Sequence, residues 1–142
     1  MDVEHVMQQY RRAWETSDDA LLASLFAPDG VYRNTPFAEQ RGHEAIRRYW
    51  DRTKLQRDIR LTYEILQRTE HGGIAHWRTT YQVASEEMFR MWAASAGTNL
   101  IARKPGDPLP RLVLDGIAIV ELDGDGLCRE LRLWWHATPE LA

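Results

Sequence analysis

Two histidines and one aspartate in the strand-forming part of this sequence could carry acid–base chemistry. His76 alternates with Arg78 and Gln82, a pattern typical of a solvated sheet face. His136 follows an expected C-terminal strand, and histidine is the side chain whose charge changes most readily near neutral pH. Asp115 lies in the preceding expected strand and could form half of an acid–base pair. We favour a solvated position for His76 and keep His136 as a catalytic candidate.

Other kinds of chemistry lack their usual sequence motifs. The five His and the single Cys show no HExxH, no CxxC and no paired spacing on one face, so we expect no metal site. No glycine-rich phosphate loop or dinucleotide fingerprint is present, and the Gly-Asp-Gly segment at 124–126 is explained by a hairpin turn. No cofactor is therefore expected. The serines do not lie in a nucleophile elbow, so covalent acyl chemistry has no support.

Composition limits the partners further. The 142 residues suit one domain with its own core, and the net charge of -3 with interleaved Arg, Asp and Glu argues against a nucleic-acid partner. Cys128 has no second cysteine to pair with, and no apolar run approaches the ~20 residues that span a bilayer. The first five residues lack the basic and apolar regions of a signal peptide. We therefore expect a soluble cytoplasmic protein that is not bound to a membrane.

Two helices are expected at the start of the chain. Apolar residues at helical spacing predict an amphipathic helix over 3–14. Thr16 or Ser17 can cap a second, short helix that continues through Phe26. The Pro-Asp-Gly segment at 28–30 is expected to end it.

A short strand and a third helix follow. Residues 31–35 favour a strand, and Pro36 opens a loop. Gly42 precedes a helix whose apolar side holds Tyr49 and Trp50.

Beyond this helix the apolar period changes from that of a helix to that of a strand. Alternation over 59–65 and 75–83, with a turn at 71–73, predicts a β-hairpin. A second hairpin is predicted from 114–122 and 131–135, which a Gly-Asp-Gly turn connects. Helices followed by antiparallel strands indicate an α+β domain with one sheet face packed on the helices.

The segment from Ser85 to Arg111 is the least informative part of the sequence. Residues 86–94 could form a helical turn or a wide strand, and 104–108 must form a turn or loop. A carboxylate from this segment that swings over a pocket mouth would favour an enzyme. The candidates are Glu86, Glu87 and Asp107.

The whole chain resembles the NTF2-like superfamily, and within it the SnoaL-like and ketosteroid-isomerase-like proteins. The resemblance is carried by segments 25–32 and 41–50 and by the final hairpin. It implies that residues 1–142 form a single NTF2-like cone, in which a curved, mixed and mostly antiparallel sheet wraps around three N-terminal helices. This fold hosts isomerases, hydrolases, cyclases, dehydratases and non-catalytic modules, so the resemblance does not fix an activity.

The isomerase mechanism of these relatives needs a carboxylate base and two proton donors around an enolate oxygen. Tyr10 matches the family's oxyanion tyrosine. Asn34 stands where the general-base Asp would be, and an amide cannot accept a proton at neutral pH. Ala118 stands at the position of the second, acidic donor, and Trp50 and Phe26 replace the supporting tyrosines. The resemblance thus implies a pocket that keeps the shape of the isomerase site but lacks the residues for isomerase chemistry.

The sequence also lacks catalytic residues of two other activities of the superfamily. Leu133 occupies the place of the last-strand Asp of limonene-epoxide hydrolases. SnoaL-type cyclases use an acidic base and a histidine, for which His136 is the best remaining candidate. If Ala118 faces the pocket, Asp115 faces away from it, three positions along a two-residue period, so we take Asp115 as structural or interfacial.

Three hypotheses remain open for function. The first is an enzyme that acts on a small, mostly apolar molecule, with Tyr10 as donor, Asn34 orienting the ligand, and Trp77 and Trp135 as walls. The second is a non-catalytic binder of such a molecule in the same pocket, and the third is a protein-interaction module whose cone is filled by its own side chains. Tyr10 and Trp14 are favoured as core aromatics, which is compatible with pocket lining. The expected ligand-binding residues are Tyr10, Trp14, Tyr32, Asn34, Trp50, Trp77 and Trp135.

The outer face of the final hairpin carries its own signal. If Leu133 and Trp135 turn inward, then Trp134 points outward, where Ile117 and Ile119 join it. Such an exposed apolar patch marks an interface. We therefore expect a homodimer formed through this sheet face, as the resemblance also implies.

Overall fold

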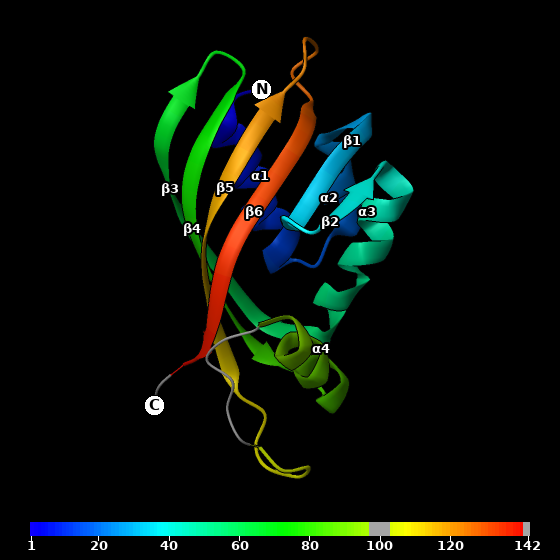
Figure 1. Ribbon diagram of the computed structural model, residues 1–142, viewed down its shortest axis with the longest axis vertical. Helices are drawn as coiled ribbons and strands as arrows, with labels where there is room; N and C mark the ends of the chain where they lie inside the picture. The colour runs from blue at the N-terminus through cyan, green and yellow to red at the C-terminus, as the bar shows by residue number, and fades with distance from the viewer. Residues whose placement is uncertain (97–102, 141–142) are drawn as a thin grey trace.

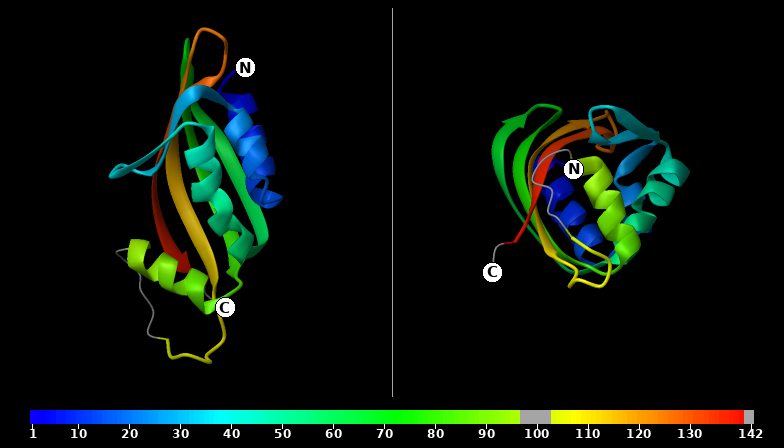
Figure 2. Two further views of the ribbon diagram at one scale, coloured as in Figure 1. Left: turned by 90° about the vertical axis from the view of Figure 1, so that its right-hand side faces the viewer. Right: turned by 60° about the horizontal axis from the view of Figure 1, so that its bottom comes forward.

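A strongly curved six-stranded sheet folds around three helices in the computed structural model, which describes residues 1–96 and 103–140 (Figures 1 and 2). The helices are α1 (Val3–Glu15), α2 (Asp19–Ser24), α3 (His43–Trp50), the 3-10 turn η1 (Asp51–Leu55) and α4 (Glu86–Ala96). The strands are β1 (Phe26–Thr35), β2 (Ala38–Arg41), β3 (Gln56–Thr69), β4 (Gly72–Val83), β5 (Arg111–Leu122) and β6 (Cys128–Pro139). The predicted α+β cone is confirmed, and α4 crosses one end of it (Figure 1).

The strand order is β2-β1-β6-β5-β4-β3. All neighbouring strands are antiparallel except β1 and β6, which pair in parallel. This pairing joins the N-terminal hairpin to the meander of β3 to β6. The sheet is therefore mixed, as predicted.

Helix α1 follows its predicted pattern. Asp2 caps it by accepting a hydrogen bond from the backbone N–H of His5 at 2.9 Å. Its apolar face is buried against β3 and β4, and Tyr10 and Trp14 lie on that face. The helix thereby carries two aromatic side chains into the cone.

Helix α2 differs from the prediction at both ends. Its cap is Asp18, which accepts from the N–H of Leu21 at 2.9 Å. Neither predicted residue takes this role, because Thr16 is the C-cap of α1 and Ser17 has a φ of 52°, in the left-handed region. The helix stops at Ser24, and Phe26 already pairs with Cys128 of β6.

The Pro-Asp-Gly segment at 28–30 lies inside β1 and does not end a helix, contrary to the prediction. The pairing with β6 shifts register across this segment, between Phe26 and Val31. A Cβ on Gly30 would lie 2.8 Å from the carbonyl oxygen of Cys128. Glycine is therefore needed here for the close approach of β6, and not for a helix terminus.

The sequence did not predict strand β2 and left the structure of helix α4 open. The short strand β2 pairs with β1 across the turn at Pro36 and Phe37, where only a loop was predicted. Residues 86–96 form helix α4 and not a strand. The turn between β3 and β4 is tighter than predicted, because β4 already begins at Gly72.

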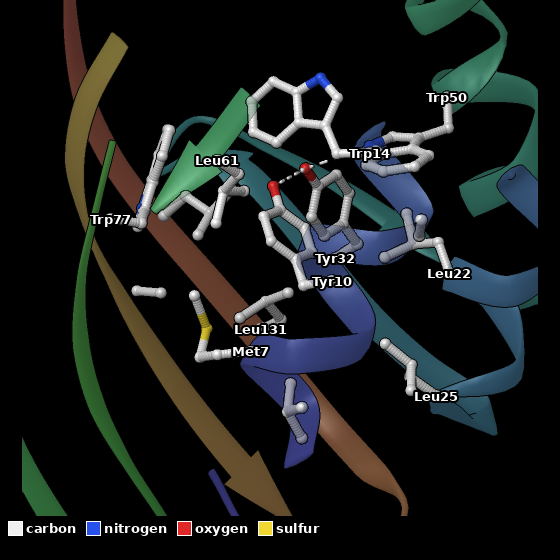
Figure 3. Packing of buried hydrophobic residues seen from close by; sticks show 14 of the residues in the cluster. Met7, Tyr10, Trp14, Leu22, Leu25, Tyr32, Trp50, Leu61, Trp77 and Leu131 are labelled. Carbon is white, nitrogen blue, oxygen red and sulfur yellow. Dashed lines mark hydrogen bonds between the residues drawn. The ribbon is translucent and has the colours of Figure 1, made fainter. Parts of the chain in front are cut away.

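Aromatic side chains fill the interior of the cone. The Trp14 ring centroid lies 5.6 Å from Tyr10, 6.1 Å from Trp50 and 5.7 Å from Trp77. Figure 3 shows these rings packed between α1, α3 and the sheet, with Met7 and Leu131 below them. Among the described helices, none combines the length and the apolar character needed to cross a bilayer.

Candidate functional site

A small cavity lies at the α4 end of the cone. Side chains from every described helix and strand except α2 and β2 line it: Trp14, Tyr32, Asn34, Tyr49, Trp50, Arg52, Thr53, Gln56, Tyr81, Met88, Met91, Trp92, Leu114 and Trp135. Its interior volume is about 50 Å³, which holds a few water molecules. Because ligand pockets usually measure about 300–1,000 Å³, the cavity is too small for a typical ligand in this conformation.

Helix α4 lines the cavity with apolar side chains. Met88 and Trp92 are buried, and Met91 joins them one turn along the helix. Both methionines have unbranched, flexible side chains that repack easily. Helix α4 therefore forms an adaptable apolar cover over the end of the cone.

A chain of hydrogen bonds runs along one wall of the cavity. Tyr32 Oη donates to Asn34 Oδ1 at 3.2 Å, and Asn34 Nδ2 donates to Tyr49 Oη at 2.9 Å. Since the single Tyr32 proton is used on Asn34, the 3.1 Å contact between Tyr10 and Tyr32 requires Tyr10 to donate (Figure 3). Trp50 Nε1 also donates to Tyr32 Oη, at 3.4 Å.

Burial keeps the tyrosines of this chain neutral. It raises the pKa of Tyr10 well above the ordinary value, and the neighbouring Tyr32 raises it further. It likewise raises the pKa of Tyr32. Both hydroxyls therefore remain protonated hydrogen-bonding groups at neutral pH and cannot serve as bases.

Two indole N–H groups donate hydrogen bonds to polar atoms in the wall of the cavity. Trp14 Nε1 donates to Gln56 Oε1 at 2.8 Å, and Trp135 Nε1 donates to the backbone oxygen of Asn34 at 2.6 Å. The first bond links α1 to the start of β3, and the second links β6 to β1. These bonds hold two walls of the cavity in place.

Arg52 is the one charged residue in the described lining. Its Nε donates to the backbone oxygen of Tyr49 at 3.1 Å, and its guanidinium carbon lies 3.8 Å from the centroid of the Tyr49 ring. Within the described part of the chain, no carboxylate pairs with this guanidinium. The wall thus combines a neutral hydrogen-bond chain with a single positive charge.

The described lining contains no Asp, Glu or His. Glu86 pairs with Arg103, Glu87 is exposed, and Asp107 accepts from the backbone N–H of Lys104, so none of the three candidate carboxylates lines the cavity. Residues 97–102 lie outside the described part of the chain, and their sequence contains no acidic residue and no histidine. Among the described residues, no group of three His, Cys, Asp or Glu could hold a metal ion.

Five of the seven expected ligand-binding residues line the cavity: Trp14, Tyr32, Asn34, Trp50 and Trp135. The other two do not. Tyr10 is in the core, where its hydroxyl contacts that of the lining residue Tyr32, and Trp77 is fully buried beside Trp14 (Figure 3). They were expected in the lining because they face inward, but inward residues midway along α1 and β4 pack in the core.

The two catalytic candidates are not brought together. His136 is exposed on the outer sheet face, beside Asp115 and Trp134, whereas Tyr10 is in the core. Since β6 alternates with period two, His136 points away from the cavity that Trp135 lines. Ala118 and Leu133, which replace family carboxylates, are buried on the inner face.

Sequence reasoning missed a large part of the lining. Tyr49 and Tyr81 were placed on inward faces but were not recognised as site residues, and Gln56 and Arg52 gave no pattern. The α4 residues lie in the segment whose structure the sequence left open. Only the inward period of β4 could have identified Tyr81 in advance.

His76 and Asp115 form a separate cluster on the outer face. His76 Nε2 lies 2.8 Å from Asp115 Oδ1, and Arg78 and Glu64 lie nearby. The hydrogen bond that His76 donates to the Asp115 carboxylate raises the pKa of His76. This cluster is on the solvent side of the sheet and does not touch the cavity.

A curved sheet closed by helices around an end cavity defines the class of cone-shaped α+β pocket domains, and comparisons with known proteins identify the family. The model of the SnoaL-like domain matches residues 7–131. The chain therefore belongs to the SnoaL-like family, and its fold is that of the NTF2-like superfamily.

One solved structure similar to the chain is that of SalBIII, an epoxide hydrolase/cyclase-like enzyme with a role in pyran ring formation in the polyether salinomycin. The two share 11% sequence identity with a TM-score of 0.65, and the match covers 96% of this chain and 95% of the SalBIII chain. At this identity the likeness shows the fold. No curated protein matched the sequence.

Proposed function

We propose that this protein binds a small, mostly apolar molecule in the cavity under α4. The observation that carries the proposal is the lining, in which aromatic and methionine side chains surround one polar wall formed by Asn34, Tyr49 and Arg52. Ligand sites typically combine such an apolar surface with a few placed polar groups.

Binding without proton transfer fits this lining better than acid–base catalysis does. The residue at the base position, Asn34, uses its oxygen to accept from Tyr32 and its nitrogen to donate to Tyr49. No described lining residue can take up a proton near neutral pH. We therefore favour a ligand-binding role, with cyclase- or isomerase-like catalysis as the second candidate because the family and the SalBIII fold include enzymes.

A ligand needs a larger cavity than this conformation has. The volume of about 50 Å³ is too small for a molecule with a ring system. Helix α4 contacts the rest of the fold mainly through β4 and buries only part of its surface. Displacement of its methionine and tryptophan side chains would extend the cavity toward that end of the cone.

The test compares the two adjacent tryptophans of β6, which lie on opposite faces. Thermal melting is followed with a panel of apolar compounds that includes terpenoids, steroids, polyketide-like aromatics and epoxides. A compound that binds the native state raises the melting temperature by mass action. We expect at least one shift that Trp135→Ala removes and Trp134→Ala keeps. No shift with any compound, or equal loss in both variants, would refute the proposal.

We also propose that the outer sheet face forms a homodimer. Phe37 is 95% exposed and Trp134 is 40% exposed, and both line a shallow recess with Ile117 and Pro36. Ile119 lies further along the same face of β5. A contiguous exposed apolar patch of this kind is typical of an interface between subunits.

Light scattering after size exclusion tests the dimer at about 10–50 µM, a range in which interfaces with micromolar or tighter affinity are occupied. The mass of a dimer is expected for the wild type and that of a monomer for Trp134→Glu. Leu66→Glu is the matched control, since Leu66 is 51% exposed on β3, away from the recess. A monomeric wild type would refute the dimer but not the ligand site.

A further inference from the structure

Arg52 lines the cavity, and most of its hydrogen-bond donors have no protein partner among the described residues. Of its five N–H donors, only Nε–H has a partner in the described part of the chain, the backbone oxygen of Tyr49. The stacking of the guanidinium on the Tyr49 ring, at 3.8 Å, fixes its plane. The two Nη groups are thus held in one orientation at the cavity wall.

Among the described residues, no carboxylate pairs with Arg52 to balance its positive charge. The adjacent carboxylate, Asp51, pairs with Lys54 at 2.8 Å, and the described lining contains no acidic residue. The charge of Arg52 acts on the lining residues Tyr32 and Tyr81. It lowers the pKa of each hydroxyl, although the larger effect of burial raises both. A partly buried cation without a counter-charge costs free energy that an anion in the cavity would recover.

Tyr49 supplies a second donor beside the guanidinium. Its oxygen accepts from Asn34 Nδ2 at 2.9 Å, so its own proton is free to point toward a ligand. A guanidinium and a hydroxyl on the same wall are the donors that a carboxylate requires, and charge-assisted hydrogen bonds of this kind are the stronger ones. Asn34 and Arg52 both hold Tyr49 in position for this contact.

We propose that the ligand is an apolar carboxylic acid, whose carboxylate binds Arg52 and the Tyr49 hydroxyl while its apolar body lies among Trp14, Trp135 and the α4 side chains. This inference rests on the proposed function, because it names the chemical class of the molecule that the cavity binds. A neutral ligand of the same shape would leave the Arg52 charge unpaired. The acid should therefore bind more tightly than its neutral isostere.

Calorimetry with matched probes tests the proposal. Naphthalene-2-carboxylate, biphenyl-4-carboxylate and decanoate are each compared with the corresponding primary amide at pH 7.5. For the wild type we expect at least one acid to bind about tenfold or more tightly than its amide, as charge-assisted hydrogen bonds imply. Arg52→Gln should remove this preference, and Tyr49→Phe should reduce it.

Arg57→Gln is the matched control, since Arg57 is an exposed arginine on β3 outside the lining and its change alters net charge equally. If Arg52→Gln does not fold by circular dichroism, Arg52→Lys keeps the charge but loses the planar fork and should lower the preference partly. Equal binding of acids and amides, or binding of neutral compounds only, overturns the anionic ligand and leaves the pocket proposal intact. If no probe and no panel compound binds, both proposals fail.

Discussion

Replacing Tyr32 with Phe should destabilise the protein at least twice as much as replacing Tyr10 with Phe, although both changes remove one buried hydroxyl. The difference lies in the number of hydrogen-bond partners of each hydroxyl. Tyr32 Oη contacts Tyr10 at 3.1 Å, Asn34 at 3.2 Å and Trp50 Nε1 at 3.4 Å. Tyr10 Oη contacts only Tyr32 within the described part of the chain.

The magnitudes follow from the groups that lose their partners. Tyr10→Phe removes one neutral hydrogen bond and leaves Tyr32 with two others, which costs about 1 kcal/mol. Tyr32→Phe strands the hydroxyl of Tyr10 and the indole N–H of Trp50, whose residues are 1% and 3% exposed. At about 1–3 kcal/mol for each unsatisfied buried group, the loss is roughly 2–6 kcal/mol.

Urea denaturation followed by tryptophan fluorescence measures both values. With a slope of about 2 kcal/mol per molar, the midpoint should fall by about 0.5 M for Tyr10→Phe and by at least about 1 M for Tyr32→Phe. The slope should not change, since neither variant alters the surface exposed on unfolding. Equal midpoints for the two variants would refute the assigned hydrogen-bond chain, because Tyr32 would then hold no more partners than Tyr10.

Three further outcomes follow from the structure. Gly116→Ala should lower stability by about 1–3 kcal/mol, as overpacking does, because a Cβ there would lie 2.3 Å from the backbone oxygen of Trp134. Gly124→Ala, with no atom within 4 Å of its Cβ, is the control in thermal melts, and equal melting temperatures would contradict the packing described. Asp115 raises the pKa of His76. The pair therefore stabilises the folded state fully at pH values below the ordinary pKa of 6.5, and this stabilisation is lost as the pH rises through the folded-state pKa. NMR titration should show a lower His76 pKa in Asp115→Asn, and an unchanged pKa would exclude the contact. Burial raises the pKa of the Cys128 thiol to about 12, so a thiol reagent at pH 8 should modify the unfolded chain rapidly and the native protein hardly at all, whereas rapid native labelling would show that β6 opens.

Most of the fold could be predicted because its long elements carry strong periodicity. The alternation in β3 to β6 and the apolar face of α1 each extend over enough residues to identify the element and its buried side. The predicted start of β1 was wrong because Leu25 and Phe26 also fit the apolar face of a helix. Their pairing with β6, about 100 residues away in the sequence, decides the conformation and leaves no local signal.

The candidate site was only partly predictable for a similar reason. Inward-facing aromatic residues could be identified, but the sequence does not say which of them reach the cavity and which pack in the core. Tyr10 and Tyr32 are both buried aromatics, and only the tertiary arrangement places Tyr32 in front of Tyr10. Arg52 lies in a short 3-10 turn, where no period distinguishes a wall residue from a surface one.

The parallel pairing of β1 with β6 determines the order in which the sheet can be completed during synthesis. Phe26 pairs with Cys128, so at about 5–20 residues per second the hairpin of β1 and β2 waits roughly 5–20 s for the strand that joins it to the sheet. Until then the free edges of β1 and β5 are both available to other chains. A ribosome that stalls after β5 but before Cys128 therefore leaves two unpaired strand edges. Truncated products of this length should be targets for chaperones and proteases.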